Sequence, residues 1–558
     1  YLTDSTKGTM PIYQEIPNLS AAKSAYGNIV YRKAPSFLRQ AEFYLGEDKF
    51  QTAVRAFSKK HQFKNAEWQD LVTEFQTVSW STKGYPYFAE LSPEKQKKLE
   101  ARDKKIVKDW AEYWVRQPGA PIIRVGLTEG HYEKSLPSTN GRWASSSWMV
   151  PALGLSLSAP FDDSPWALRI KTLYKYGAEI EIQENFVSGN PWTDNLPRLF
   201  DKDKNYNRNH PMPDLIFPNY QDYGYGIFLL DEKSRAYVLE NIQNEKDAFL
   251  RSMMWGTLWD SVREAEMNPE DYVRLAIKNI SVEQDELTIQ TILSRVSTAM
   301  NYYLSDAQRQ ELTPRVESLL LGGMLRAKTT GQKVTFFRAY LNLASTEDAQ
   351  RMLKKILKSD RQPVKMETTA AVAGEMPQLE LPPLKTKDKF DILTRLIILE
   401  DRQRYLGSDE AEQMLAALEK TETSDDAKRY AYAARAGIGK PENKAKFWND
   451  FVNNREISES WIEAAFVPFN SVRHSELTLP YLEKALAELP NLKRTRKIFF
   501  VNGWLAAFIG GQKDEKALAI VNKFLADNPN LDRDLRLKIL ENADTLERAV
   551  RIRAKYGK

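Results

Sequence analysis

Residues 232–558 constrain the fold most, because apolar side chains recur there at intervals of three and four and strand-like segments no longer occur. Leu393, Leu396 and Ile397 are one example of this helical spacing. Helices joined by short turns cannot each bury an apolar face by themselves, so we expect them to stack in pairs. The sequence therefore predicts a large helical solenoid over 232–558, interrupted by a proline-rich loop at 361–387.

The first 231 residues change character once, at the turn-rich segment QPGAP (117–121). Before it, helical periodicity runs through 36–75 and 93–115, with Gly46 as a helix stop. After it come the short β-type segments IIRVGL, SSSWMV, WALRIKTL, AEIEIQENF and YGIFLLD. The alternation in AEIEI is typical of a half-buried strand. We predict a helical region at 1–116 and a small β-sandwich at 117–231, in a mostly α, multidomain chain.

The composition is that of a globular protein with several domains. A chain of 558 residues exceeds one hydrophobic core, and 42% hydrophobic with 28% charged residues supplies both interiors and surfaces. The net charge of +5 is small for this length, so neither nucleic acid nor an anionic membrane surface is indicated as a partner. With no cysteine, disulfides and thiolate chemistry are excluded, while cytoplasm and periplasm both stay open.

The first residues of the given sequence do not have the pattern of a signal peptide. The sequence starts at Tyr1 rather than Met, in polar sequence without the charged and apolar regions of a signal peptide. No run of about 18 apolar residues occurs, so we expect a soluble chain without a transmembrane helix. We also expect that a segment upstream of Tyr1 has been removed.

Common catalytic motifs are missing from the sequence. The four histidines are His61, His131, His210 and His474, and none begins an HExxH motif, in which two imidazoles on one helix face bind zinc. A nucleophile elbow, a Walker-type phosphate loop and a GxGxxG helix start are also absent. The residues by themselves therefore propose no active site.

One block near the start nevertheless resembles a known family. The segment 29–45, IVYRKAPSFLRQAEFYL, is similar to the YxKGA segment and following helix of the M1 zinc aminopeptidases, which are gluzincins of the aminopeptidase N type. The resemblance implies that Tyr31 is catalytic and donates a hydrogen bond to the oxyanion of the tetrahedral intermediate. Taken by itself, Tyr31 also fits an aromatic residue packed on the core at a helix start. Ala34-Pro35 replaces the family's Gly-Ala, which alters that helix start.

Further blocks follow in the order of this family. WAEYWVRQPGAPIIRV (110–125) resembles the passage from the catalytic domain into a β-sandwich, and LIFPNYQDYGYGIFLLD (215–231) resembles the last strands of that sandwich. The segments 253–273 and 424–452 resemble later helices, in which we interpret Trp255, Trp259 and Trp448 as packing anchors rather than substrate contacts.

The resemblance implies a protein that removes N-terminal residues from peptides. Residues 1–116 would be the helical end of a thermolysin-like catalytic domain, 117–231 its β-sandwich neighbour, and 232–558 a HEAT/ARM-like solenoid. The family's zinc ligands, an HExxH motif and a downstream Glu, precede the matched segments. We therefore expect zinc in the intact protein, but no zinc and no peptidase activity in this chain by itself.

Two alternatives stay open. A non-enzymatic helical scaffold fits the missing ligands as well, either a peptidase relative that lost its metal site or an interaction protein that presents a concave solenoid surface. A nucleic-acid-binding solenoid is disfavoured, because lysines such as Lys95, Lys97 and Lys98 are balanced by neighbouring acids. The sequence does not determine which N-terminal residue is preferred, the compartment or the oligomeric state.

Overall fold

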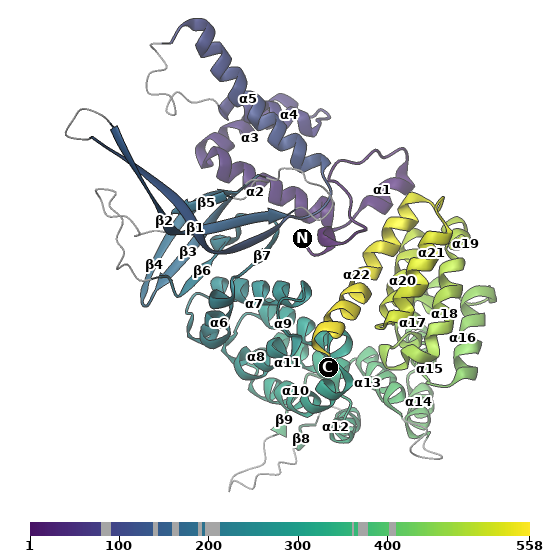
Figure 1. Cartoon of the computed structure of the whole chain (residues 1–558). Helices are drawn as coiled ribbons and strands as arrows, with labels where there is room; N and C mark the ends of the chain where they lie inside the picture. Colours follow the sequence, from purple (N-terminus) through teal and green to yellow (C-terminus); the bar gives the residue numbers. More distant parts are fainter. Residues whose placement is uncertain are drawn as a thin grey trace. The chain divides into compact units, whose positions relative to one another are not determined.

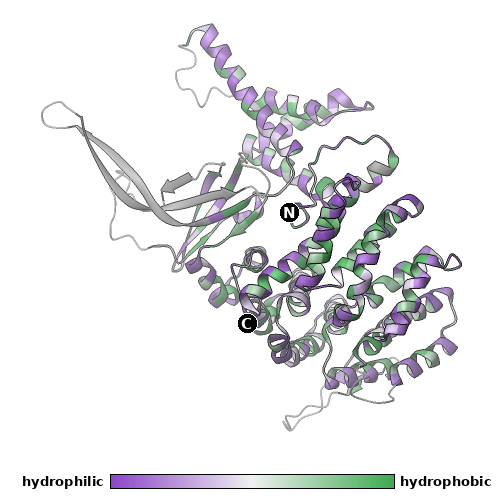
Figure 2. Ribbon diagram, turned by 45° about the vertical axis from the view of Figure 1, so that its right-hand side comes forward, coloured by the Kyte–Doolittle hydropathy of each residue, from purple (hydrophilic) through white to green (hydrophobic). Residues whose placement is uncertain are grey.

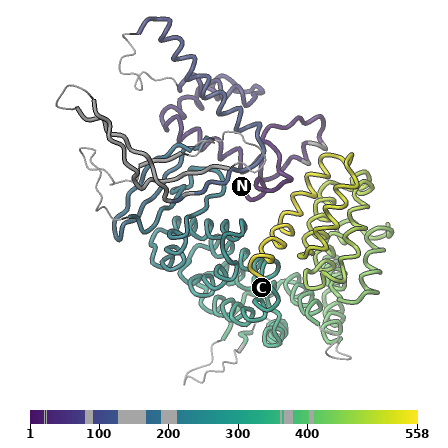
Figure 3. The backbone as a smooth tube through the Cα atoms, in the orientation of Figure 1, coloured from purple at the N-terminus to yellow at the C-terminus, as the bar shows by residue number. Residues whose placement is uncertain are grey.

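A computed structural model of the chain describes residues 1–79, 91–137, 143–158, 167–187, 192–195, 212–359, 362–365, 378–400 and 409–557. The described residues are mostly helical, as the sequence predicts. They form two compact units, Tyr1–Asp260 and Ser261–Lys558. The colour ramps of Figures 1 and 3 follow the chain through both of them.

Helices dominate the first 116 residues. After α1 (Leu19–Ala25), a π-helical turn η2 (Ile29–Lys33) leads into α2 (Ala34–Leu45), and α3 (Glu47–His61), α4 (Trp68–Ser79) and α5 (Pro93–Arg116) follow. Gly46 ends α2 with a φ of +87°, a left-handed conformation that favours glycine, so its predicted role as a stop is confirmed. Ser92 caps α5 by accepting a hydrogen bond from the Lys95 amide.

The strands of the first unit lie between Ile122 and Leu229 and form two sheets. β1 (Ile122–Pro137), β2 (Trp143–Ser158), β5 (Trp192–Asn195) and β7 (Ile227–Leu229) make a four-stranded sheet in the order β5-β2-β1-β7. β3 (Leu168–Tyr176), β4 (Glu179–Val187) and β6 (Leu215–Phe217) make a three-stranded sheet in the order β4-β3-β6. β1 and β2 pair antiparallel from Ile122 opposite Ser158 to Pro137 opposite Trp143.

The AEIEI segment is a half-buried strand, as predicted, but its isoleucines lie on the exposed face. Ile180 and Ile182 of β4 are 49% and 50% exposed, while Phe186 on the same face is 44% exposed. β4 is an edge strand whose buried positions are Asn185 and Val187. Alternation identifies the strand, whereas which of its faces is covered depends on neighbours far away in the sequence.

Helices and strands of the first unit share one hydrophobic core. Phe37 of α2, Phe75 of α4 and Trp114 of α5 belong to the same buried cluster as Ile170 of β3 and Phe228 of β7. The Trp114 side chain is completely buried, and its ring lies 6.2 Å from that of Phe37. This core fixes α2 against the three-stranded sheet.

The chain is again helical after β7. α6 (Glu232–Asn241) and most of α7 (Ala248–Arg263) complete the first unit, and Trp255 and Trp259 of α7 are buried as predicted. The helices of the second unit are α8 (Pro269–Asn279), α9 (Glu286–Thr298), η8 (Ala299–Tyr303), α10 (Asp306–Arg326), α11 (Thr330–Leu343), α12 (Glu347–Lys358), α13 (Thr386–Leu399), α14 (Glu410–Thr421), α15 (Asp425–Ala436), α16 (Pro441–Asn453), α17 (Glu459–Phe469), α18 (Ser475–Ala487), α19 (Leu489–Thr495), α20 (Ile498–Gly510), α21 (Glu515–Asp527) and α22 (Arg533–Tyr556).

Within the segment predicted as a proline-rich loop, the described residues contain a short two-stranded ladder. β8 (Val364–Lys365) pairs antiparallel with β9 (Gln378–Leu379), and α13 already begins at Thr386. Arg361 and residues 366–377 of this segment lie outside the described residues.

Aromatic side chains fill the core of the second unit's C-terminal half. Trp504 of α20 is fully buried, and its ring lies 4.4 Å from that of Phe508 and 5.7 Å from that of Trp448. Trp448 is therefore a packing residue, as predicted. Figure 2 shows hydrophilic and hydrophobic residues interspersed along these helices, which is the pattern of amphipathic helices.

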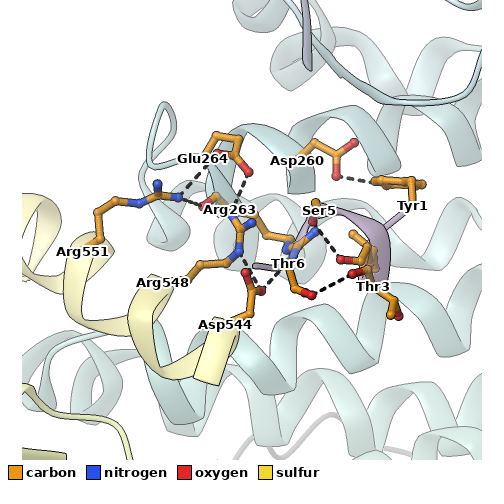
Figure 4. A network of polar contacts seen from close by, with 11 residues as sticks. Tyr1, Thr3, Ser5, Thr6, Asp260, Arg263, Glu264, Asp544, Arg548 and Arg551 are labelled. Atoms are coloured by element: carbon orange, nitrogen blue, oxygen red, sulfur yellow. Dashed lines mark hydrogen bonds and ion pairs between the residues drawn. The ribbon is translucent and has the colours of Figure 1, made fainter. Parts of the chain in front are cut away.

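Within the second unit, ion pairs join residues 263–264 to the C-terminal helix α22, as drawn in Figure 4. Arg548 of α22 donates to the Glu264 carboxylate at 2.7 Å, to the Arg263 carbonyl at 2.9 Å and to the Asp544 carboxylate at 2.8 Å. Arg263 is paired with Asp544 at 3.1 Å. Burial lowers the pKa of Arg548, but the two carboxylates outweigh it and the net change is upward.

The sequence predicts no transmembrane helix, and the described part of the chain contains several long helices that can be compared with this prediction. None of the helices found there combines the length and the apolar character that crossing a bilayer requires.

Candidate functional site

Tyr31 lies in the π-helical turn η2, which continues directly into α2. Its side chain is 62% exposed, and its ring lies 6.2 Å from that of Tyr26. An aromatic residue packed in the core, the other interpretation of the sequence, is not what the structure contains. Tyr31 is therefore a surface residue, and its catalytic role stays a prediction.

Lys33, two residues further along, is fully buried. Residues two positions apart on a helix point in roughly opposite directions, so the burial of Lys33 turns Tyr31 outward. The Lys33 ammonium donates to the carbonyls of Gln117 and Gly119 at 2.9 and 3.0 Å. It also forms an ion pair of 2.9 Å with Asp4. Lys33 therefore attaches η2 to the loop after α5 and to the N-terminal segment.

Asp4 is the centre of this buried network. Its carboxylate accepts hydrogen bonds from the Gly119 amide at 3.0 Å, from the Tyr225 hydroxyl at 2.9 Å and from the Thr9 hydroxyl. Desolvation lowers the pKa of Lys33, although the Asp4 carboxylate opposes this change. Burial and the same carboxylate raise the pKa of Tyr225. Every polar atom described here has a partner, which a buried charge requires.

Gln40 fixes the next turn of α2 against the sheet. Its side-chain amide donates to the Arg169 carbonyl at 2.8 Å and to the Tyr223 carbonyl at 2.6 Å, and its oxygen accepts from the Arg169 amide at 3.0 Å. Gln40 is buried. The helix carrying Tyr31 at its start is thus held by side-chain to main-chain hydrogen bonds at two successive turns.

The loop between β6 and β7 reaches the same region through an unusual backbone. Asn219 has a φ of +56°, and its side chain accepts from the Gly224 amide at 2.5 Å and donates to the Gly224 carbonyl at 3.1 Å. A Cβ atom on Gly224 would lie 2.8 Å from both Ile170 and Phe228. Only glycine fits at this position, which explains the NYQDYGYG segment in physical terms.

A cavity of about 450 Å³ opens beside this helix start. Arg32, Pro35 and Ser36 line it from the η2–α2 junction, and Asp222 and Tyr223 line it from the β6–β7 loop. The α7 residues Phe249, Met253 and Asp260 complete the wall, and Tyr1 donates to Asp260 at 3.0 Å (Figure 4). Tyr31 does not itself line this cavity.

The described residues offer no donor set for the zinc ion that we expect in the intact protein. No group of three or more His, Asp or Glu side chains within the described ranges is arranged to hold a metal ion. His61 stacks on Phe57, with ring centroids 5.1 Å apart, and His474 is half-buried in the second unit. His210 and the His131 side chain lie outside what is described. We therefore assign no reaction step to a metal held by these residues.

Sequence reasoning identified Tyr31 but missed the residues that hold it. A usable signal was present: Ile29, Lys33 and Phe37 are spaced by four, so a lysine occupies a position on an otherwise apolar helix face. All three side chains are buried. Asp4 and Tyr225 gave no such signal. In the sequence, Asp4 lies more than 20 residues from Lys33 and Tyr225 more than 190, so only the folded structure brings them together.

Two family models match the chain. The model described as "Peptidase family M1 domain" matches residues 1–85, and the model described as "ERAP1-like C-terminal domain" matches residues 215–548. The first match contains Asp4, Tyr31 and Lys33, and the second begins at the strand β6.

Individual relatives agree with these models. The chain is 24% identical over 560 residues to "Aminopeptidase N" of Streptomyces lividans, which covers 99% of this chain and 58% of that protein. It is 30% identical over 151 residues to "Aminopeptidase M1-C" of Oryza sativa subsp. japonica, covering 26% of this chain and 14% of the relative. It is 29% identical over 123 residues to "Tricorn protease-interacting factor F2" of Thermoplasma acidophilum, covering 22% of this chain and 13% of the relative. The chain thus spans less than two thirds of the length of these relatives.

Proposed function

Because the chain belongs to the M1 family of peptidases, aminopeptidase N-like in sequence, we propose that it forms the part of a zinc aminopeptidase that follows the metal site. In that enzyme it supplies Tyr31 to the hydrolysis of the first peptide bond of a substrate. The observation that carries the proposal is the exposed Tyr31 residue at a helix start, where the buried Lys33–Asp4 ion pair attaches the helix to the N-terminal segment.

The chemical role of Tyr31 follows from its phenol group. Attack of water on a peptide carbonyl places negative charge on the carbonyl oxygen, and a phenol can donate a hydrogen bond to that oxygen without losing its proton. Donors that are fixed before the reaction stabilise such charge best, since no reorganisation is needed at the moment of reaction. The buried Lys33–Asp4 pair and the Gln40 contacts support such a fixed position for the backbone of η2 and α2.

The remaining chemistry belongs to groups that the described residues do not supply. M1 peptidases are zinc-dependent, and a bound zinc ion polarises the carbonyl and activates water. The sequence contains no HExxH motif, so in the proposed enzyme the zinc ligands come from another segment. We accordingly propose that this chain hydrolyses no peptide by itself.

The domain organisation that we propose follows the same family. Residues 1–116 form the helical end of the thermolysin-like catalytic domain, 117–231 a β-sandwich and 232–558 a HEAT/ARM-like solenoid. The order of elements supports it, because helices up to Arg116 are followed by strands from Ile122 to Leu229 and then by helices from Glu232 onward. The substrates we propose are peptides with a free amino end, in accordance with the names of the aminopeptidase relatives.

Two measurements test the proposal. The purified chain, incubated with zinc, is assayed on aminoacyl-anilides, and we expect no hydrolysis above background. In a polypeptide that joins this chain to an HExxH-bearing segment, Tyr31→Phe should lower kcat by about 100-fold or more with little change in KM, because it removes only the phenol hydrogen bond. Tyr26→Phe, at the neighbouring exposed ring, is the matched control and should leave kcat unchanged.

The outcome separates the enzyme from the scaffold alternative. If the joined polypeptide has no peptidase activity although it binds zinc, the non-enzymatic scaffold is the better description. If it is active and Tyr31→Phe retains full kcat, the assignment of Tyr31 is wrong while the family assignment stands.

A further inference from the structure

A second cavity, of about 620 Å³, lies wholly within the second unit and is unrelated to the Tyr31 region. It is lined by α9, η8, α11, α13 and the ends of α17 and α20. Its volume is in the range of pockets that hold small organic molecules, and larger than a single inorganic ion needs. The charged side chains in its wall are Arg338, Asp391 and Arg395.

Arg395 has hydrogen-bonding capacity that the protein does not use. Its Nε atom donates to the Ala344 carbonyl at 2.9 Å, and neither terminal nitrogen has a hydrogen-bond acceptor among the described residues. Desolvation, together with the nearby charge of Arg473, lowers the pKa of Arg395 to about 10, while Glu317 opposes this. The guanidinium group is therefore still charged at neutral pH, and its terminal donors are unoccupied.

Glu317, the carboxylate that opposes the lowering of the Arg395 pKa, is already occupied by other donors. Glu317 accepts hydrogen bonds from the Ser345 and Thr346 amides at 2.7 and 3.0 Å and from the Thr346 hydroxyl. It stabilises the start of α12 and forms no ion pair with Arg395 within the described part of the unit. A buried or half-buried cation without a partner is unfavourable, so an anion that enters the cavity gains from pairing with Arg395.

Other donors converge on the same space. The Ser297 hydroxyl oxygen accepts from the Asn342 and Asn301 amides at 2.7 and 3.3 Å, which leaves its own proton to donate. Arg338 is exposed and has no ion-pair partner among the residues described. The single carboxylate of the wall, Asp391, is paired with Lys387 at 2.5 Å, so it adds little repulsion.

We propose that this cavity binds a small organic anion, a molecule that presents a carboxylate or phosphate group to Arg395. The planar guanidinium group matches the paired oxygens of either group, and its charge-assisted hydrogen bonds supply the specificity for an anion. The polar wall formed by Ser297, Asn301 and Asn342 holds the rest of the molecule. This inference is independent of the proposed peptidase function, since it uses none of the residues of the Tyr31 region.

Titration calorimetry with the full chain tests the proposal. The probes are glutarate as the carboxylate, inorganic phosphate as the phosphate, and glutaramide as the neutral analogue of glutarate. We expect millimolar or tighter binding of at least one anion, weakened by added salt, and no binding of glutaramide. Binding of glutarate or of phosphate identifies which group the site prefers.

Three variants test whether the anion binds at the arginines of this cavity. Arg395→Met should weaken anion binding by about tenfold or more, and Arg338→Met by a smaller factor because that side chain is exposed. Arg315→Met, an exposed arginine of α10 outside the cavity wall, makes the same change of charge and should leave binding unaltered. Arg338→Met also keeps the proposal testable if Arg395→Met does not fold.

The proposal is overturned by any of three results. These are no binding of either anion at millimolar concentration, equal binding of glutaramide and glutarate, or equal weakening of anion binding by Arg315→Met and by the variants of the cavity wall.

Discussion

Lys33 and Asp4 form an ion pair of 2.9 Å in which both side chains are inaccessible to solvent. A buried pair of this kind contributes little net stability relative to apolar residues, but removal of one member leaves an uncompensated charge. Here the pair joins the N-terminal segment to the turn that presents Tyr31. Its main effect is therefore positional: it determines which side of η2 faces inward.

Lys33→Met should destabilise the first unit by about 3–5 kcal/mol, because Asp4 would be left buried without its cation. The free energy of unfolding, measured by urea denaturation, checks this. Lys60→Met is the matched control, since Lys60 is 59% exposed in its pair with Glu74 and such pairs contribute less than about 1 kcal/mol. Equal effects of the two substitutions would contradict a structural role for the buried pair.

Gly224→Ala should destabilise the same unit by about 1–3 kcal/mol, because the new Cβ atom would lie 2.8 Å from Ile170 and Phe228. Gly503→Ala provides the contrast. Gly503 lies inside α20, and its added Cβ atom would make an ordinary contact of 3.7 Å with Phe466 of α17. In the interior of a helix, alanine is favoured over glycine by about 0.5–1 kcal/mol. Thermal unfolding of the two variants should therefore shift in opposite directions, and a stabilised Gly224→Ala variant would contradict the close packing around the β6–β7 loop.

The sequence predicted the elements that have a strong local signal. The charged helix at 93–115 appears as α5, and each of the five β-type segments after QPGAP contributes residues to a strand. Helical spacing and the alternation of apolar and polar residues in a strand depend only on residues of the same element. Such elements can therefore be predicted from the local sequence. The block around Tyr31 was identified for a different reason, its resemblance to a family.

Features that depend on distant partners could not be predicted. The exposure of Ile180 and Ile182 is set by what covers the edge of the three-stranded sheet, not by the strand itself. The association of Asp4 with Lys33 likewise arises from tertiary packing, and so does the position of Arg395, which has no ion-pair partner among the described residues. In the sequence, Arg395 is one charged residue in an amphipathic helix and has no distinguishing pattern.

Arg548→Met should loosen the contact between the end of α22 and residues 263–265. The substitution removes hydrogen bonds to Arg263, Glu264 and Asp544, of which both carboxylates keep a second arginine nearby. We expect a loss of about 3 kcal/mol, the low end for breaking a buried ionic network. Hydrogen exchange should increase in α22 above all. Arg351→Met, at a site 63% exposed, is the control and should change neither stability nor exchange. Unchanged exchange in α22 of the Arg548 variant would contradict this assignment.

Lys444 of α16 should make the second unit more stable as the pH rises. Its side chain is fully buried, and its ammonium donates to the carbonyls of Ala436 and Phe469 at 2.9 and 2.8 Å. It has no carboxylate partner in the part of the chain that the structure describes. Desolvation lowers its pKa from the ordinary 10.5 to about 7. Between these two values the unfolded chain binds more protons than the folded one, so the free energy of unfolding increases by up to about 1.4 kcal/mol per pH unit.

Lys444→Met should abolish this dependence between about pH 7 and pH 10, the window set by the lowered and the ordinary pKa. The quantity to measure is the difference in unfolding free energy between wild type and variant at each pH, because groups common to both then cancel. His474, which the charge of Lys444 affects, does not interfere: burial and the charges of Lys444 and Arg473 lower its pKa to about 4, so it is neutral throughout. Lys446→Met, at an exposed position of the same helix, should leave the pH dependence as it is in wild type. A wild-type slope that survives in Lys444→Met would show that the buried amine is not its source.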